Sequence, residues 1–155
     1  MLVGSNGNHL VFFNVGSAAC RIAADKGKYS QSKITVMGFS LGTGVANYVS
    51  SKKDIDRLIL LAPYANGCDL YNNVLDIFHG ALEVIVSYKM EAIEFAKDVK
   101  VRPTIIISTS DTVVPNSSSI RLSKAYPKGS DLIFVHEVSH NSITETAEVM
   151  EVLGQ

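Results

Sequence analysis

Runs of apolar residues alternate along this chain with stretches that carry apolar residues at helical spacing. Four of the runs stay apolar through consecutive positions, which is typical of strands buried on both faces of a parallel sheet. These runs cover residues 33–39, 57–62, 103–108 and 131–138. An earlier β-rich run at residues 10–15 also predicts a strand. Most of the predicted sheet is therefore expected to be covered by helices.

The stretches between these strands have the apolar spacing of amphipathic helices. Residues 17–26 carry a stripe of small apolar side chains behind Ser17, a candidate N-cap. Residues 69–98 keep a helical periodicity that breaks near His79. Further helices are predicted at residues 41–51, 117–125 and 143–153. From residue 33 onward strands and helices alternate, which predicts an α/β fold with a mostly parallel sheet, helices on both faces and right-handed crossovers.

A G-x-S-x-G motif lies where the first buried strand ends and the next helix begins. Its residues are Gly38, Ser40 and Gly42. A sharp strand-to-helix turn at this point would lift the Ser40 hydroxyl above the sheet edge and strain the Ser40 backbone, while the glycines remove Cβ atoms that would clash. The free N–H groups at the helix start would face a developing oxyanion. In this context we expect Ser40 to be a nucleophile rather than a capping serine.

A nucleophilic serine requires a base, and the base requires an orienting group. Asp111 follows the third buried strand, and His140 follows the fourth. Because ligands bind at the carboxyl ends of strands in open α/β sheets, Ser40, Asp111 and His140 are expected to meet at that edge. The structural alternatives are an Asx turn ahead of Pro115 for Asp111 and a helix N-terminal position for His140.

Taken together, these motifs resemble the α/β-hydrolase superfamily of serine hydrolases over about residues 33–153. Segments 38–46 and 58–64 are similar to the elbow and the following strand of the monoacylglycerol-lipase-like and depalmitoylase-like branch. Segment 111–115 and the pair His140-Asn141 match the acid and base motifs of that family in order and position. The fold implied by the resemblance agrees with the one that the alternating pattern predicts.

The resemblance also implies a role for each site residue. Ser40 would be the nucleophile, His140 the general base and Asp111 the acid that orients it. The backbone N–H of Leu41 would be one oxyanion donor. No metal or organic cofactor is implied. Three small residues depart from the family pattern without disturbing the triad: Ser108 and Ser139 stand where glycines are usual, and Ser142 stands where an acid is frequent.

The segment ahead of the elbow strand is shorter than in the family, where several strands precede the elbow. The second oxyanion donor normally comes from a loop after an early strand. If Leu2-Val3 forms a strand, Ser5 or Asn6 would supply that N–H; a flexible tail is the alternative. The expected molecule is thus a single truncated α/β-hydrolase-like domain over residues 1–155, and its exposed sheet edge favours pairing with a second copy.

Two features of the sequence suggest how a substrate would be bound. The resemblance equates residues 69–98 with a helical lid-like insertion over the acyl pocket, although their apolar stripe also fits a core or a dimer surface. Tyr64 follows the strand at 57–62 and would line the pocket or pack in the core. His9 and His79 lack metal-ligand spacing and are expected on the surface. His136 falls within the last predicted strand and is expected to be packed or on the surface.

Composition and charge limit the classes of partner and the cellular compartment that we expect. Lys plus Arg is 14 and Asp plus Glu is 15, and this near-neutral balance argues against a nucleic-acid-binding protein. Cys20 and Cys68 form no disulfide framework and are expected to be reduced core residues. The longest apolar run, residues 58–65, is too short to span a membrane. No Lys or Arg precedes Arg21, so the positive region of a secretory signal is absent and a lipid-modified Cys20 has weak support.

These observations predict a cytoplasmic serine hydrolase that cleaves a small acyl ester or thioester through an acyl-enzyme at Ser40. No nucleic-acid partner and no stable membrane insertion are expected. The alternative is a non-catalytic remnant of the same fold that serves as an interaction domain, in which the loss of early strands has removed part of the oxyanion hole.

Overall fold

The computed structural model describes residues 2–3, 9–13, 34–67, 69–70 and 91–154 of the chain. Several predictions lie outside these residues: the helix at 17–26, the second oxyanion donor at Ser5 or Asn6, both cysteines, His79, and most of the lid-like segment 69–98.

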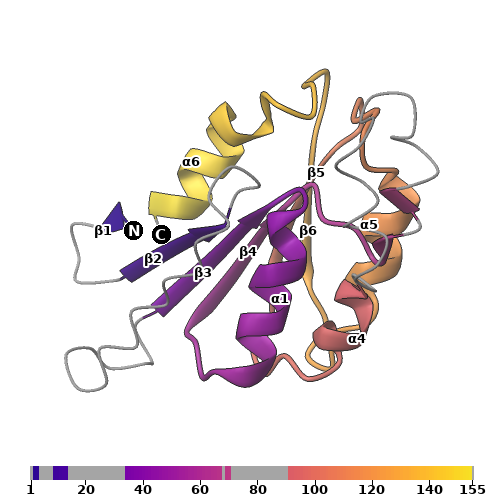
Figure 1. Cartoon of the computed structure of the whole chain (residues 1–155). Coiled ribbons are helices and arrows are strands. Elements are labelled where there is room, and N and C mark those ends of the chain that lie inside the picture. The colour runs from indigo at the N-terminus through magenta and orange to yellow at the C-terminus, as the bar shows by residue number, and fades with distance from the viewer. Residues whose placement is uncertain (1, 4–8, 14–33, 68, 71–90, 155) are drawn as a thin grey trace, which may run out of the picture.

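The strands form one six-stranded sheet in the order β1-β2-β3-β4-β5-β6 (Figure 1). β1 pairs antiparallel with β2, and every later pairing is parallel. The mostly parallel sheet predicted from the sequence is confirmed. The strand bounds are Leu2–Val3 for β1, His9–Phe13 for β2, Ile34–Phe39 for β3, Arg57–Leu61 for β4, Thr104–Ser108 for β5 and Asp131–Val135 for β6.

Helices cover both faces of this sheet, as predicted (Figure 1). One face is covered by α1 (Gly42–Lys52), α4 (Ala92–Ala96) and α5 (Asn116–Ser123). The opposite face is covered by the 3₁₀ helix η2 (Ile143–Glu145) and by α6 (Ala147–Gly154). No helix in the described part of the chain combines the length and the apolarity needed to cross a membrane.

Each central strand sends alternate side chains into two separate hydrophobic cores. In β4, Leu58 and Leu60 enter the core beneath α1, whereas Ile59 and Leu61 enter the core beneath α6. In β5, Ile106 belongs to the α6 side, and its two neighbours Ile105 and Ile107 belong to the α1 side. Because successive strand residues point to opposite faces, burial of both faces explains why these runs are apolar at every position.

The last strand is shorter and more exposed than the sequence predicts. The apolar run at 131–138 predicts a core strand, but β6 ends at Val135 and lies at one end of the described strand order. Leu132 and Phe134 are 38% and 42% exposed. Apolar content alone does not distinguish an edge strand from a central one. His136 is also exposed and follows the strand rather than lying within it, which corrects its predicted position.

The C-terminal helix is divided where one continuous helix was predicted at 143–153. Thr146 adopts an extended conformation between η2 and α6. Its carbonyl accepts a hydrogen bond from the Met150 N–H at 3.1 Å, and its hydroxyl accepts one from the Val149 N–H at 3.4 Å. Threonine is a favoured N-cap residue, so α6 begins after it as an independent helix.

Candidate active site

Ser40 occupies a sharp turn between β3 and α1. Its φ is 52°, in the left-handed region that costs a non-glycine residue energy. The Ser40 N–H donates to the Leu61 carbonyl of β4 at 2.9 Å. The Ser40 carbonyl accepts from the Thr43 N–H at 3.0 Å and from the Thr43 hydroxyl at 2.6 Å. Hydrogen bonds on both backbone groups therefore hold the strained turn in place.

Gly38 allows α1 to fold back directly over β3. A Cβ atom at this position would lie 2.8 Å from the Ala46 Cβ and 2.8 Å from the Thr43 Cα. Real Cβ atoms do not approach this closely, so the first turn of α1 requires glycine here. The predicted reason for the first glycine of the motif is thereby confirmed.

Gly44 has a similar role that the sequence analysis missed. A Cβ atom at Gly44 would lie 2.1 Å from the Tyr64 hydroxyl oxygen. Tyr64 is 1% exposed and belongs to the core beneath α1, and this burial raises its pKa. The structure thus places Tyr64 under the first turns of α1, as the packing alternative expects.

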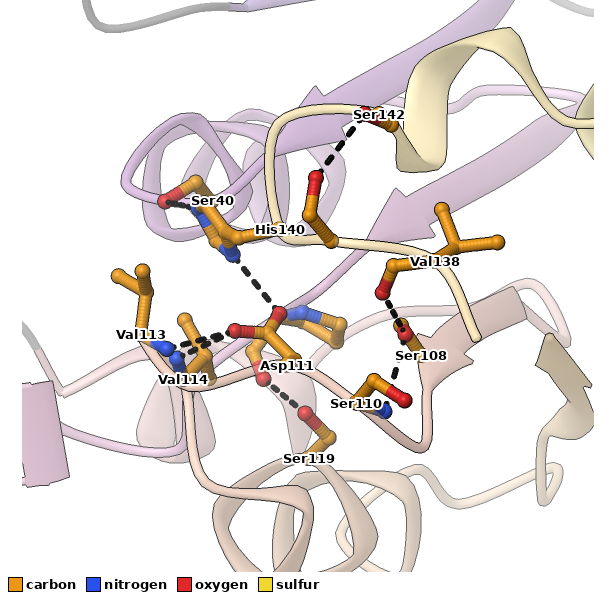
Figure 2. Close-up of polar contacts among 12 residues, drawn as sticks. Ser40, Ser108, Ser110, Asp111, Val113, Val114, Ser119, Val138, His140 and Ser142 are labelled. Carbon is orange, nitrogen blue, oxygen red and sulfur yellow. Dashed lines mark hydrogen bonds and ion pairs between the residues drawn. The ribbon is translucent and has the colours of Figure 1, made fainter. Parts of the chain in front are cut away.

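The side chains of Ser40, His140 and Asp111 form one hydrogen-bonded chain (Figure 2). His140 Nε2 lies 2.9 Å from Ser40 Oγ, and His140 Nδ1 lies 2.7 Å from Asp111 Oδ2. The His140 side chain is 9% exposed and the Asp111 side chain 1%. The three residues come from the ends of β3, β5 and β6, so the structure brings together the residues that the sequence predicted to meet.

Asp111 also makes the Asx turn that is the structural alternative to a catalytic role. Its Oδ1 accepts hydrogen bonds from the Val113 N–H at 2.8 Å and from the Val114 N–H at 2.9 Å (Figure 2). The first of these is an Asx turn. Oδ2 remains directed at His140, so the backbone of the loop fixes the orientation of the carboxylate toward the imidazole.

The His140 ring is held on a second side by an aromatic contact. The ring centroids of Phe39 and His140 are 5.0 Å apart, with an interplanar angle of 34°. His140 lies in the turn ahead of η2, where the Ser142 N–H donates to the Ser139 carbonyl at 3.1 Å and the two hydroxyls are 2.9 Å apart. The sequence motifs give Phe39 no role of its own; its position directly before Ser40 is the signal that points to it.

Leu41 stands at the start of α1, next to the nucleophile. It has helical backbone angles, and its carbonyl accepts from the Gly44 N–H at 3.3 Å. Within the described part of the chain the Leu41 N–H has no acceptor, and it lies at the positive end of α1, where backbone N–H groups commonly bind anions. The second donor, predicted at Ser5 or Asn6, lies outside the described residues and stays a prediction.

The comparisons with known proteins identify the fold. No protein-family model and no curated protein sequence matches the chain. Among solved structures, the esterase domain of a Rhodothermus marinus protein aligns with a TM-score of 0.62 and 13% identity over 77% of this chain. An α/β hydrolase enzyme, MGS-MChE2, from a sediment metagenome of the Mar Chica lagoon aligns at 0.57 and 21% over 80%. The Pyrococcus horikoshii acylaminoacyl peptidase aligns at 0.59 and 12% over 76%.

These alignments show a shared architecture rather than a shared substrate. They cover 58% of the esterase domain, 60% of the metagenomic enzyme and 21% of the peptidase, so the chain spans less than two thirds of each. The monoacylglycerol-lipase-like branch suggested by the motifs stays a prediction. What the comparisons and the sheet topology together establish is that this chain has the α/β-hydrolase fold.

Proposed function

We propose that this protein is a serine hydrolase that cleaves an acyl ester or thioester through an acyl-enzyme on Ser40. One observation carries the proposal: the continuous hydrogen-bonded chain from Ser40 Oγ through the His140 imidazole to the Asp111 carboxylate, at 2.9 Å and 2.7 Å. The buried and fully connected arrangement favours this function over a non-catalytic interaction domain.

In the acylation step, Ser40 Oγ attacks the substrate carbonyl carbon while His140 Nε2 takes the hydroxyl proton. Asp111 holds the imidazole with its Nδ1 proton toward the carboxylate and stabilises the imidazolium that forms. The Leu41 N–H donates to the developing oxyanion, a type of interaction whose loss typically costs about 10²–10³ in turnover. The tetrahedral intermediate then collapses, and His140 returns the proton to the departing alcohol or thiol.

In the deacylation step, a water molecule replaces the leaving group. His140 takes a proton from this water, which attacks the carbonyl carbon of the Ser40 ester. A second tetrahedral intermediate releases the carboxylic acid, and Ser40 regains its proton from His140. Each group returns to its starting state. With the ester or thioester and one water molecule as the reactants, Ser40 and His140 carry every proton transfer of the cycle.

The substrate class is proposed from the motif segments. The motif segments around Ser40 and Asp111 resemble the branch that hydrolyses acyl esters and thioesters. The solved structures that share the fold include proteins described as an esterase domain, an α/β hydrolase and an acylaminoacyl peptidase, so the fold does not separate an ester from an amide. The motif resemblance favours an oxygen or sulfur leaving group.

A fluorophosphonate probe tests the activated nucleophile directly. We expect one label per chain, mapped by peptide mass to Ser40, absent in Ser40→Ala and strongly slowed in His140→Ala. Ser51→Ala is the matched control, because this serine lies on the same helix α1 with its hydroxyl bonded to the Tyr48 carbonyl. Folded protein that does not react, or reacts equally well in Ser40→Ala, would contradict the proposal.

A substrate panel then separates the leaving groups. Nitrophenyl esters of increasing acyl length, the corresponding thioesters and the corresponding anilides should be compared under one set of conditions. We expect turnover of esters and thioesters that exceeds anilide turnover and disappears in Ser40→Ala. Faster cleavage of the anilides would replace the proposed ester hydrolase with an amidase on the same triad.

A further inference from the structure

Ser108 is a buried polar residue that the proposed chemistry leaves unused. It is the last residue of β5, is 0% exposed, and stands where the resemblance leads one to expect glycine. Alternation along β5 places its side chain on the same face as Ile106, toward α6 and the chain segment that leads to His140. A buried hydroxyl is costly unless it is hydrogen-bonded, so its partners indicate why it is tolerated.

The Ser108 hydroxyl bonds to two different loops (Figure 2). It donates to the carbonyl of Val138, two residues before His140. It accepts from the N–H of Ser110, the residue before Asp111, at 3.1 Å. One side chain therefore connects the segment that carries the base with the segment that carries the acid.

This connection lies where the regular sheet pairing between the two strands has ended. β5 and β6 stay in register up to Ser108 and Val135, and the Thr109 N–H donates to the Val135 carbonyl at 2.9 Å. Beyond that point the chain turns away at Glu137, whose φ is 59°. The Ser108 hydroxyl thus makes a cross-strand hydrogen bond that the backbone no longer provides.

We propose that Ser108 is a positioning residue for the triad: its hydroxyl holds the His140 segment at a fixed distance from the Asp111 segment. His140 must bond to Ser40 and Asp111 at the same time, so a shift of its backbone lengthens at least one of these bonds. Displacement of a reacting group by about 1 Å can cost about 10²-fold in rate. The inference rests on the proposed function, because turnover at Ser40 is its first readout.

Ser108→Ala and Ser108→Gly remove the hydroxyl and test this role. We expect kcat to fall about 10- to 100-fold in both variants, with KM within about two-fold of the parent value. Ser108→Thr keeps a hydroxyl on a residue type that strands favour, and should recover most of the lost kcat. Ser123→Ala is the matched control, because the hydroxyl of this buried serine donates to the Ile120 carbonyl within the same helix, α5.

A spectroscopic readout tests the same role without turnover. The ¹⁵N chemical shifts of the His140 ring report its hydrogen bonds to Ser40 and Asp111, and the Ser110 amide reports its bond to Ser108. We expect both to change in Ser108→Ala and to stay unchanged in Ser123→Ala. His140 ring shifts that remain those of the parent protein in Ser108→Ala would overturn the inference, even in a protein that turns over no ester.

The kinetic outcomes separate this inference from the proposed function. If Ser40 is labelled and required but Ser108→Ala and Ser108→Gly keep the parent kcat, the positioning role is wrong and the hydrolase proposal stands. If Ser108→Thr is as slow as Ser108→Ala, the hydroxyl is not the cause of the loss. If Ser40→Ala keeps full activity, the proposed function itself fails.

Discussion

Asp111 uses its two carboxylate oxygens for different purposes. Oδ1 accepts two backbone N–H groups of its own loop, and Oδ2 accepts from His140. The turn that a structural interpretation would assign to Asp111 is therefore the device that aims it at the imidazole. The two alternative roles of Asp111 therefore belong to the two oxygens of one carboxylate.

This division of roles predicts that Asp111→Asn lowers turnover but leaves stability close to that of the parent. The amide oxygen can still accept from Val113 and Val114, so we expect the melting temperature to stay close to that of the parent. The amide cannot maintain the required imidazole tautomer, and kcat should fall about 10⁴-fold. Steady-state kinetics and thermal melts check the two expectations.

Asp111→Ala and Asp54→Asn provide the comparisons for this experiment. The alanine variant loses the turn as well and should be both inactive and less stable. Asp54 forms an exposed ion pair with Lys100 at 2.9 Å, far from the triad in the fold, and its asparagine variant should keep parent turnover. An Asp111→Asn protein with parent kcat would remove Asp111 from the proposed mechanism.

At the scale of elements, α1 is placed by close backbone approaches rather than by large apolar contacts. Gly38 allows the helix to lie on β3, and Gly44 allows it to lie on Tyr64. A buried polar chain supports the same helix: the Tyr126 hydroxyl donates to Asn47 Oδ1 at 2.6 Å, and Asn47 Nδ2 donates to the Thr43 carbonyl at 3.0 Å. The helix that begins beside Ser40 is thus fixed along its length.

Gly44→Ala should disturb this packing, and Tyr64→Phe should relieve it. The added methyl would meet the Tyr64 oxygen at 2.1 Å, and an overpacked core typically costs about 1–3 kcal/mol. Without that oxygen, the nearest ring atom lies 3.1 Å from the new Cβ, so the double variant should regain much of the lost stability. Urea unfolding of the two single variants and the double variant measures the coupling; strictly additive losses would show that the two side chains do not meet.

Element types followed from the sequence more reliably than element ends. The runs at 57–62 and 103–108 were recognised because burial on both faces leaves an uninterrupted apolar signal. β6 was predicted too long, since an edge strand with the same composition can leave the sheet after Val135 without exposing a central face. Thr146 divides the last helix through a capping preference that periodicity does not record.

At the scale of the whole molecule, two buried tyrosines make the stability of the fold depend on pH. Burial raises the pKa of Tyr64 and of Tyr126 above the ordinary tyrosine value of about 10. The folded chain therefore keeps both phenols protonated at pH values where the unfolded chain ionises them. Their contribution to the free energy of unfolding is fully present below about pH 10 and is lost as the pH rises above that value.

Alkaline unfolding should show this dependence. Above about pH 10 each buried tyrosine should contribute about 1.4 kcal/mol per pH unit to the decline in the free energy of unfolding. Tyr64→Phe and Tyr126→Phe should each reduce that slope, whereas Tyr48→Phe, at a side chain that is 49% exposed, should leave it unchanged. Equal slopes in all four proteins would show that neither buried phenol is responsible.

The candidate site was more predictable than the contacts that support it. Ser40, Asp111 and His140 could be named because their motifs sit at strand ends, and parallel strands bring those ends to one edge. The roles of Gly44 and Ser108 depend on which side chain of another element lies opposite, and a single sequence contains no record of that pairing. Tyr64 was ambiguous for the same reason.

The exits from the sheet have a consequence for how this site could change over evolution. Left-handed residues follow β3, β4 and β6 within two positions of the strand end, at Ser40, Ala62 and Glu137. Each of them sets the direction of its connecting loop within the first two residues after the strand. Insertions and deletions farther along those loops therefore leave these first residues in place. The same rigid frame can acquire new substrate preferences by exchange of loop tips, while the reacting atoms keep their places.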